Sequence, residues 1–170
     1  MNYLVNSTLV IAILATIACQ TNMSAKESAA LYSQGQNPPG GKTVVKTDAE
    51  WKKQLTPDQY EVLRKHGTER AGTSPLLNVH EDGTFYCAGC HNPLFSYKTK
   101  FESGTGWPSF YEPISKNAVK VGKDNSYGMD RDEVLCSVCN GHLGHVFNDG
   151  PKPTGLRYCM NGVAMTFAKK

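Results

Sequence analysis

The sequence has no long apolar run, no cluster of basic residues and no internal repeat, and each absence excludes a class of protein. Its longest apolar stretch, Leu9 to Ala18, is shorter than the ~20 residues that a membrane-spanning helix needs. The 18 Lys and Arg residues form no run and the net charge is only +3, so we expect no nucleic-acid partner. No repeat of solenoid spacing occurs. A hydrophobic content of 39% is still enough for one core.

Charged side chains are also missing from the N-terminal segment, up to Ala25. The apolar stretch within it has the length of the apolar region of a secretory signal peptide. The residues Thr-Ile-Ala-Cys19 resemble a bacterial lipoprotein signal, in which the cysteine is lipidated and becomes the mature N-terminus. We therefore predict that residues 1–19 are a signal and that the chain is exported to the periplasm and anchored through Cys19. The alternative is an uncleaved N-terminal anchor starting near Leu4.

Residues 20–46 are polar and include the run Gln-Asn-Pro-Pro-Gly-Gly, a composition that cannot bury a core. We predict a flexible linker between membrane and domain, and an ordered catalytic domain over residues 47–170. Two capping boxes mark its start, and they predict two short helices, the second of which should end at Gly67. The boxes are Thr47 with Glu50 and Thr56 with Gln59, with Pro57 at the first helical position; the expected buried residues are Trp51, Leu55, Tyr60 and Leu63.

Beyond Gly72 the sequence changes to short apolar runs separated by Gly, Pro, Asn and Asp, which is typical of strands. Long helical patterns are absent from this part. We therefore predict a mainly β domain, an antiparallel β-sheet with short N-terminal helices. The expected strands are residues 84–87, 118–121, 134–136, 146–147, 157–160 and 163–167.

Four of the six cysteines form two C-x-x-C pairs, Cys87 with Cys90 and Cys136 with Cys139. Four thiolates match the ligand set of a closed, tetrahedral structural zinc site. Because the pairs lie far apart in the sequence, the zinc would join two distant hairpins. Gly89, and the Asn-Gly that follows the second pair, suit the tight turns of such a site. Two disulfides, or a redox-active C-x-x-C, are the alternatives, although neither pair has the βαβ surroundings of a thioredoxin-like motif.

Cys159 has no partner within the domain, and a spare thiol in an exported protein indicates reactivity. On a strand Arg157, Cys159 and Asn161 would share one face. A guanidinium beside a thiol lowers the pKa of the thiol and favours the reactive thiolate. The alternative is an inert cysteine buried in the core.

Two further polar groups of residues are candidates for a site. His142 and His145 lie in what we interpret as a glycine-rich turn, where they could be metal ligands, acid–base groups or ordinary surface residues. Trp107, within Gly-Trp-Pro-Ser-Phe, could line a pocket or belong to the core.

Taken together, these segments resemble the type B methionine sulfoxide reductases, which act on the R epimer. The resemblance covers residues 48–167 approximately. The matching stretches are Leu55-Thr-Pro-Asp-Gln-Tyr60, Gly67-Thr-Glu69, Cys87-x-x-Cys90, Lys100-Phe-Glu-Ser-Gly104, Gly106-Trp-Pro-Ser-Phe110, Cys136-x-x-Cys139, Gly141-His-Leu-Gly-His-Val-Phe147, Asp149-Gly-Pro151 and Arg157-Tyr-Cys-Met-Asn161.

The resemblance implies a role for each residue of the site. Cys159 would attack the sulfoxide sulfur, release methionine and become a sulfenic acid. The two histidines would orient the sulfoxide oxygen and help to protonate it. The remaining implied residues are Trp107 and Phe147 for substrate binding, Arg157 and Asn161 for support of the thiolate, and Cys87, Cys90, Cys136 and Cys139 for structural Zn²⁺.

One departure from the family bears on the catalytic cycle. Many members carry a resolving cysteine two positions before the tryptophan, where this chain has Thr105. We therefore expect a cycle with one cysteine, in which an external thioredoxin-like reductant attacks the sulfenic acid. The expected substrates are oxidised proteins or peptides containing methionine R-sulfoxide, and the expected state is a membrane-tethered monomer.

Two other functions compete with sulfoxide reduction. Cys159, His145 and Asn161 could form the acyl-transfer set of a Cys-His hydrolase, although no oxyanion loop is recognisable. A zinc-stiffened binding module without enzymatic activity is the other alternative, and a same-face Arg, Cys and Asn does not favour it.

Overall fold

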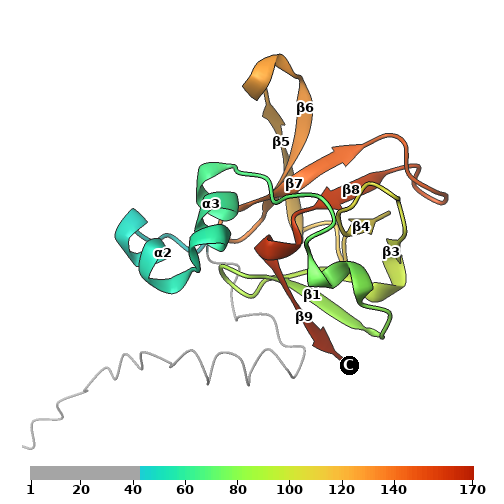
Figure 1. Cartoon of the computed structure of the whole chain (residues 1–170), viewed down its shortest axis with the longest axis horizontal. Coiled ribbons are helices and arrows are strands. Elements are labelled where there is room, and N and C mark those ends of the chain that lie inside the picture. Colours follow the sequence, from blue (N-terminus) through green and yellow to red (C-terminus); the bar gives the residue numbers. More distant parts are fainter. Residues whose placement is uncertain (1–42) are drawn as a thin grey trace, which may run out of the picture.

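The computed structural model describes residues 43–170, apart from the side chain of Tyr127. Two helices come first and are followed by short strands that pair into two antiparallel sheets (Figure 1). The helices are α2 (Asp48–Gln54) and α3 (Pro57–Lys65), and the short 3-10 turns are η1 (Pro75–Asn78), η2 (Tyr97–Thr99), η3 (Ser126–Gly128) and η4 (Gly162–Ala164). The strands are β1 (Gly83–Cys87), β2 (Pro93–Ser96), β3 (Lys100–Phe101), β4 (Ser109–Phe110), β5 (Val119–Asp124), β6 (Arg131–Cys136), β7 (His142–Phe147), β8 (Arg157–Met160) and β9 (Met165–Lys169).

The smaller sheet has the strand order β2-β1-β9 and the larger one β3-β4-β8-β7-β6-β5. Every pairing in both sheets is antiparallel, so the predicted fold class is confirmed. In Figure 1 the far end of the β5–β6 hairpin projects from the body of the domain, while α2 and α3 lie at one side of it.

Both helices start at the predicted capping boxes. Thr47 and Glu50 satisfy each other's backbone groups at the start of α2, and Thr56 and Gln59 do the same for α3. The apolar residues of both helices turn inward as expected, and the buried ones are Trp51, Leu55, Tyr60, Val62 and Leu63.

The end of α3 differs from the prediction. The helix ends at Lys65, and its left-handed capping residue is His66, with a φ of 58°, rather than Gly67. A left-handed conformation is costly for a residue with a Cβ. Here the imidazole of His66 bonds to the buried Glu133 carboxylate, which helps to hold that conformation.

The strand predictions hold best where the chain alternates apolar and polar residues. The strand expected at residues 157–160 matches β8, and those at 84–87, 118–121 and 134–136 overlap β1, β5 and β6. The interpretation of His142 and His145 as part of a glycine-rich turn is wrong, because β7 begins at His142. The last expected strand starts too early, since Gly162–Ala164 forms the turn η4. Strands β2, β3 and β4 were not predicted.

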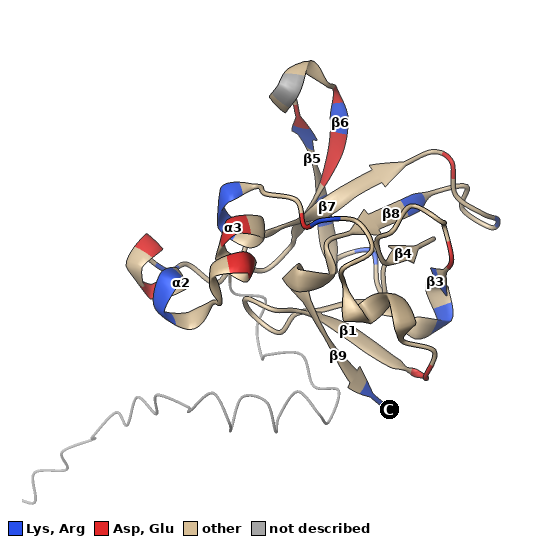
Figure 2. Ribbon diagram, viewed as in Figure 1, with Lys and Arg blue, Asp and Glu red and all other residues tan. Residues whose placement is uncertain are grey.

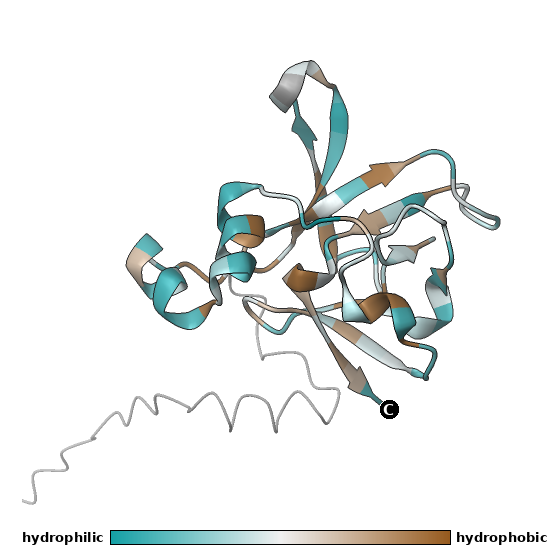
Figure 3. Cartoon of the chain, in the orientation of Figure 1, coloured by the Kyte–Doolittle hydropathy of each residue, from teal (hydrophilic) through white to brown (hydrophobic). Residues whose placement is uncertain are grey.

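Aromatic side chains fill the space between the two sheets. Phe95 of β2 stacks on Phe110 of β4 with ring centroids 4.4 Å apart, and Phe85 of β1 meets the same ring edge-on at 4.9 Å. All three phenylalanines are fully buried. Apolar residues concentrate on the central strands and on η4, whereas the helices and the β5–β6 hairpin are mostly hydrophilic (Figure 3). The core therefore joins the small sheet to the large one.

Charges of both signs lie on α2, α3 and the β5–β6 hairpin (Figure 2). Within residues 43–170 no helix has the length and apolar character that crossing a membrane requires. The predicted signal at 1–19, with Cys19, and most of the predicted linker lie outside the described residues. At its described end Val44 already contacts the domain, where its backbone N–H donates to the carbonyl of Val138 at 2.8 Å.

Candidate active site and metal centre

Cys159 lies near the middle of the large sheet, in a row of directly paired residues that crosses all six strands. Facing residues of adjacent strands point their side chains to the same side of a sheet. The register therefore places the Cys159 thiol between the Ser109 hydroxyl and the His145 imidazole, with the Glu133 carboxylate one strand further on. From β3 to β5 the row is Phe101, Ser109, Cys159, His145, Glu133 and Gly122.

His142 and His145 share one side of the sheet because β7 contains a bulge. The register against β6 shifts between Val134 and Leu135, which leaves Leu143 as an extra residue. Residues three apart in a regular strand face opposite sides, whereas a bulge brings them to the same side. The two imidazole centroids are 5.3 Å apart.

The bulge also brings the backbones of β7 and β8 unusually close at Gly144. A Cβ on this residue would lie 2.1 Å from the carbonyl oxygen of Cys159. No side chain fits there, so glycine at this position allows the strand that carries the histidines to pair tightly with the strand that carries the thiol.

We expect Gly144→Ala to destabilise the protein by about 2 kcal/mol or more, because the new methyl group forces β7 away from β8. Sulfoxide reduction should fall as well, since the same shift separates His145 from Cys159. Urea unfolding and a steady-state assay measure the two effects. Gly122→Ala is the matched control, because its Cβ would meet only side-chain atoms at 3.7 Å and 3.8 Å. A stability loss no larger for Gly144→Ala than for this control would contradict the interpretation.

The Glu133 carboxylate holds two imidazoles. Its Oε1 lies 2.6 Å from Nδ1 of His142 and 2.6 Å from Nδ1 of His66. Burial lowers the pKa of His142, and the nearby carboxylate opposes this shift. Among the described residues Nε2 of His142 has no hydrogen-bond partner, although the side chain is buried. The lowered pKa favours the neutral ring, with Nδ1–H donated to Glu133 and the buried Nε2 left as an acceptor.

His145 depends on a different carboxylate. Its Nε2 lies 2.8 Å from Oδ2 of Asp124, which comes from the end of β5, and the same oxygen accepts from Arg131 at 2.7 Å. Hydrogen bonds from Ser126 are the largest cause of the lowered pKa of Asp124, followed by the bond with His145. Asp124 therefore stays ionised near neutral pH and holds the His145 ring in place through this hydrogen bond.

Arg157 and Phe147 form the next pair of the same face, two residues along from Cys159 and His145. The guanidinium lies 4.4 Å from the centroid of the Phe147 ring and makes two hydrogen bonds to Asp149, at 2.9 Å and 2.8 Å. Asp149 is the largest cause of the raised pKa of Arg157, and Cys159 contributes as well. The predicted neighbourhood of Arg157 and Cys159 is thus present in the structure.

Asn161 and Trp107 both bind the backbone of Glu69. The Asn161 amide accepts from the Glu69 N–H at 3.0 Å and donates to the Leu143 carbonyl at 3.1 Å, while the Trp107 indole N–H donates to the Glu69 carbonyl at 3.1 Å. The Glu69 carboxylate in turn accepts the N–H groups of Gly162 at 2.5 Å and Val163 at 2.9 Å. Asn161 and Trp107 are therefore fixed by one loop, next to the strand that carries the thiol.

A hydroxyl group lies beside the thiol of Cys159. Oγ1 of Thr105 lies 3.8 Å from Sγ of Cys159. The same hydroxyl lies 2.8 Å from that of Ser103, which lies 2.8 Å from that of Ser109. Thr105, the position where the family resemblance led us to look for a resolving cysteine, therefore lies beside the sulfur of Cys159.

The two C-x-x-C pairs form matching turns at the ends of two hairpins. Cys87 ends β1 and its carbonyl accepts from His91, while Cys136 ends β6 and its carbonyl accepts from Asn140. His91 and Asn140 are left-handed, with φ of 58° and 54°. The first turn thus depends on His91 rather than on Gly89, which has an ordinary φ.

The four sulfurs of these turns lie within 4.8 Å of one another. Cys87 and Cys139 are 3.7 Å apart at Sγ, and Cys90 and Cys136 are 3.5 Å apart. A zinc ion with ligands at ~2.3 Å has sulfurs about 3.8 Å apart, whereas a disulfide needs ~2.05 Å. The cysteines are free and their spacing suits a structural zinc, which would join β1–β2 of the small sheet to β6–β7 of the large one.

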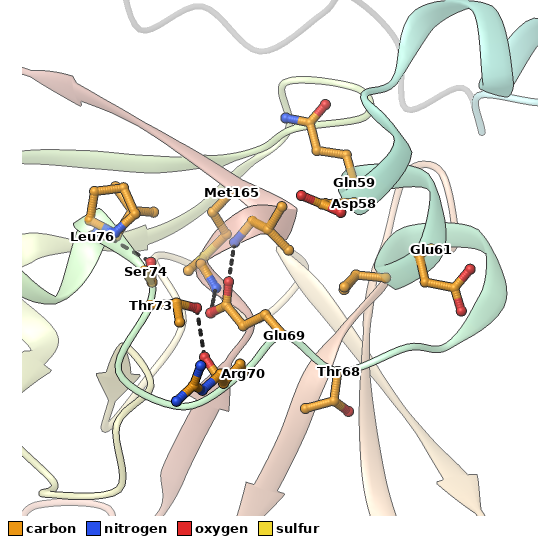
Figure 4. A pocket seen from close by; sticks show the side chains of 14 residues that line it. Asp58, Gln59, Glu61, Thr68, Glu69, Arg70, Thr73, Ser74, Leu76 and Met165 are labelled. Atoms are coloured by element: carbon orange, nitrogen blue, oxygen red, sulfur yellow. Dashed lines mark hydrogen bonds between the residues drawn. The ribbon is translucent and has the colours of Figure 1, made fainter.

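A separate cavity of about 640 Å³ lies between α3, the loop after it and η4 (Figure 4). Asp58 and Glu61 of α3 lie at one side of it, and the Glu69 carboxylate points toward the backbone of η4 within it. Its lining residues include neither Cys159 nor the two histidines. The cavity is therefore distinct from the face of the sheet that carries the thiol.

Comparison with known proteins assigns the fold and this face to a family. The SelR domain matches residues 55–169. The chain belongs to this family. It is similar to proteins named peptide methionine sulfoxide reductase MsrB. The protein from Leptospira interrogans is 57% identical over 75% of this chain and 97% of its own length. The protein from Agrobacterium fabrum is 56% identical over 73% of this chain and 92% of its own length. A Methanosarcina barkeri protein of the same name is 57% identical over 74% of this chain and 89% of its own length.

The family expected from the sequence motifs is therefore confirmed, and the chain is an oxidoreductase of the methionine sulfoxide reductase type. Three acidic residues of the site were missed by the sequence analysis. Glu133 and Asp124 hold the two histidines, and Glu69 holds the loop with Trp107 and Asn161. Only Glu69 carried a signal, as the last residue of the Gly-Thr-Glu motif.

Proposed function

We propose that the protein reduces methionine R-sulfoxide, free or within proteins, to methionine, with Cys159 as the nucleophile. The observation that carries the proposal is the row across the large sheet, which puts the thiol of Cys159 beside His145 and within reach of Arg157. A positive charge near a thiol favours the thiolate, the form that attacks sulfur.

In the proposed first step, the Cys159 thiolate attacks the sulfoxide sulfur and the oxygen takes up a proton. The oxygen passes to Cys159, which becomes a sulfenic acid, and methionine leaves as the sulfide. His142 and His145 each have one ring nitrogen bonded to a carboxylate, which fixes the orientation of both rings. Nδ1, the second ring nitrogen of His145, would then carry a proton toward the substrate oxygen, and His142 would help to orient the site through its bond to Glu133. Trp107 and Phe147 offer apolar surface to the S-methyl group.

In the second step, an external thiol attacks the sulfenic acid, and water and a mixed disulfide form. A second thiol then releases Cys159 as a thiol and leaves with the donor disulfide. The hydroxyl of Thr105, which lies beside Cys159, cannot form a disulfide. We therefore propose a thioredoxin-like donor. A bound zinc ion would be held by the four cysteines of the two hairpins and would stabilise the fold, away from these steps.

Thr105→Cys should convert the cycle to one with an internal disulfide, because the new sulfur starts about as far from Cys159 as the present 3.8 Å and needs only a side-chain rotation. After one turnover without donor, intact-mass analysis should show the loss of two hydrogens in the variant. The unsubstituted chain should instead hold a sulfenic acid that dimedone traps. Thr105→Ser is the control and should behave as the unsubstituted chain. An internal disulfide of Cys159 in the unsubstituted chain would overturn the cycle with one cysteine.

We also propose that the enzyme acts as a monomer in the periplasm, tethered through a lipidated Cys19, and repairs oxidised exported proteins. Support comes from the apolar N-terminal run and the cysteine that follows it. Cys19→Ser should release the protein from the membrane fraction into the soluble periplasm. Membrane attachment that survives this substitution would favour an uncleaved anchor.

A further inference from the structure

We propose that His66, Glu133 and His142 form a second metal site, which binds a divalent transition-metal ion such as Zn²⁺ and inhibits the enzyme when occupied. The inhibition rests on the proposed role of the neighbouring histidine in sulfoxide reduction. Binding of the ion does not depend on that role.

The three side chains offer a ligand set that zinc uses. Nδ1 of His66 and Nδ1 of His142 are each 2.6 Å from the same oxygen of Glu133, and one ligand atom from each residue lies within 4.8 Å of the others. Two imidazoles and one carboxylate, with a position left for water, is the arrangement of open zinc sites. Imidazole ligands also select zinc, cobalt, nickel or copper over magnesium and calcium.

Three separate elements supply these ligands, so the site is built by the fold. Glu133 comes from β6 and His142 from β7, and both are buried. His66 comes from the left-handed cap of α3, and 59% of its side chain is exposed. The exposed ring provides the way in for the ion, and both nitrogen–oxygen distances of 2.6 Å must open to the ~3.3 Å that separates ligands at ~2.0–2.1 Å from a tetrahedral ion.

The charge at the site also favours a cation. Glu133 is 6% exposed, and among residues 43–170 its ion-pair partners are the two imidazoles alone. Neither imidazole carries the permanent charge of an arginine side chain. A buried carboxylate without a permanent cation is costly, and a divalent ion compensates its charge.

The affinity of this site for zinc should nevertheless be lower than the affinity of the four cysteines for zinc. An ion on Nδ1 of His142 moves the ring proton to Nε2, the buried nitrogen that has no partner among the described residues. An unsatisfied buried N–H costs free energy. We therefore expect the site to fill only after the cysteine site.

Occupancy should lower sulfoxide reduction through His145. The rings of His142 and His145 are 5.3 Å apart. A bound dication on the His142 ring would repel positive charge in the neighbouring ring, so we expect proton delivery to the substrate oxygen to slow.

Binding is tested with the zinc-loaded full chain carrying Cys159→Ser, so that the reactive thiol cannot bind the added metal. Equilibrium dialysis against Co²⁺ should show uptake of a further ion, with an absorption spectrum that lacks sulfur-to-metal charge transfer. Adding His66→Ala should weaken this uptake by about tenfold or more. His80→Ala, which removes an exposed histidine outside the cluster, is the matched control and should bind as tightly as its parent.

Inhibition is tested in the chain with Cys159 intact, by single-turnover release of methionine without added thiol, because thiols chelate zinc. Added Zn²⁺ should slow release, and His66→Ala should need at least about ten times more zinc for the same inhibition relative to its own metal-free rate. Absence of a further ion in the dialysis, or equal affinity with and without His66, would overturn the proposal. Since dialysis involves no turnover, failure of the proposed reductase activity alone leaves that result unaffected.

Discussion

Replacing Cys159 with serine is expected to abolish sulfoxide reduction, with kcat/KM lowered on the order of 10³-fold or more, as for other catalytic nucleophiles. The thiolate is the attacking form, and a serine hydroxyl does not ionise near neutral pH. The neighbouring Ser109 and Thr105 offer only hydroxyl groups, so they cannot replace the sulfur. The measurement is methionine release from each epimer of a blocked methionine sulfoxide, with dithiothreitol as the donor.

The unsubstituted protein should act on the R epimer alone. Zinc content and the urea unfolding midpoint of Cys159→Ser should match those of the parent, which separates loss of the nucleophile from loss of the fold. Activity in the serine variant close to that of the parent would remove Cys159 from the reaction. If the unsubstituted protein is folded and zinc-loaded but reduces neither epimer, the proposed function itself is wrong.

Loss of zinc from the four cysteines should unfold the domain. A structural zinc site contributes ~10–16 kcal/mol in zinc-finger peptides, as much as or more than the ~5–15 kcal/mol by which a whole domain is usually stable. Here the ion would join hairpins of two different sheets, so its removal loosens the contact between them. We expect the zinc-loaded protein to show a cooperative thermal transition by circular dichroism. Cys136→Ala, or a strong chelator, should eliminate that transition.

Cys159→Ser is also the matched control for this experiment, because it removes a cysteine outside the cluster and should leave the transition in place. Returning zinc to the chelated protein should restore the transition, whereas returning it to Cys136→Ala should do so poorly. A metal-free protein that unfolds at the same temperature as the loaded one would show that the four cysteines do not stabilise the fold.

Features set by neighbouring residues could be predicted from the sequence. The capping boxes at Thr47 and Thr56 depend on residues three positions apart, and both helices start there. The alternation in Arg157–Met160 gave β8 its correct bounds. The beginning of β7 was missed because its glycine suggested a turn. That glycine is needed for the close approach of β8, which no local pattern reveals.

The residues of the candidate site also fall into two groups, those that the sequence predicted and those that only the fold reveals. Its cysteines and histidines stood out by type and spacing, and the structure brings Cys159 and His145 together. The carboxylates of Glu133 and Asp124 did not stand out, since acidic residues are common on strands that face solvent. Their contact with the histidines follows from the pairing of β5, β6 and β7 and from the bulge at Leu143. The register in which the strands pair depends on the whole sheet, so no single segment of the sequence could predict it.

The hydroxyl of Thr105 beside Cys159 determines how the proposed enzyme would fail under heavy oxidation. A neighbouring thiol would convert a sulfenic acid to a disulfide at once and so protect it. Without that thiol, the sulfenic acid persists until a donor arrives, and a peroxide that reaches it first produces a sulfinic acid, which thiols do not reverse. The lifetime of each enzyme molecule would therefore depend on whether a donor thiol reduces the sulfenic acid before peroxide oxidises it further. In a cell that runs short of reductant, the enzyme would be inactivated irreversibly instead of waiting in an oxidised but recoverable form.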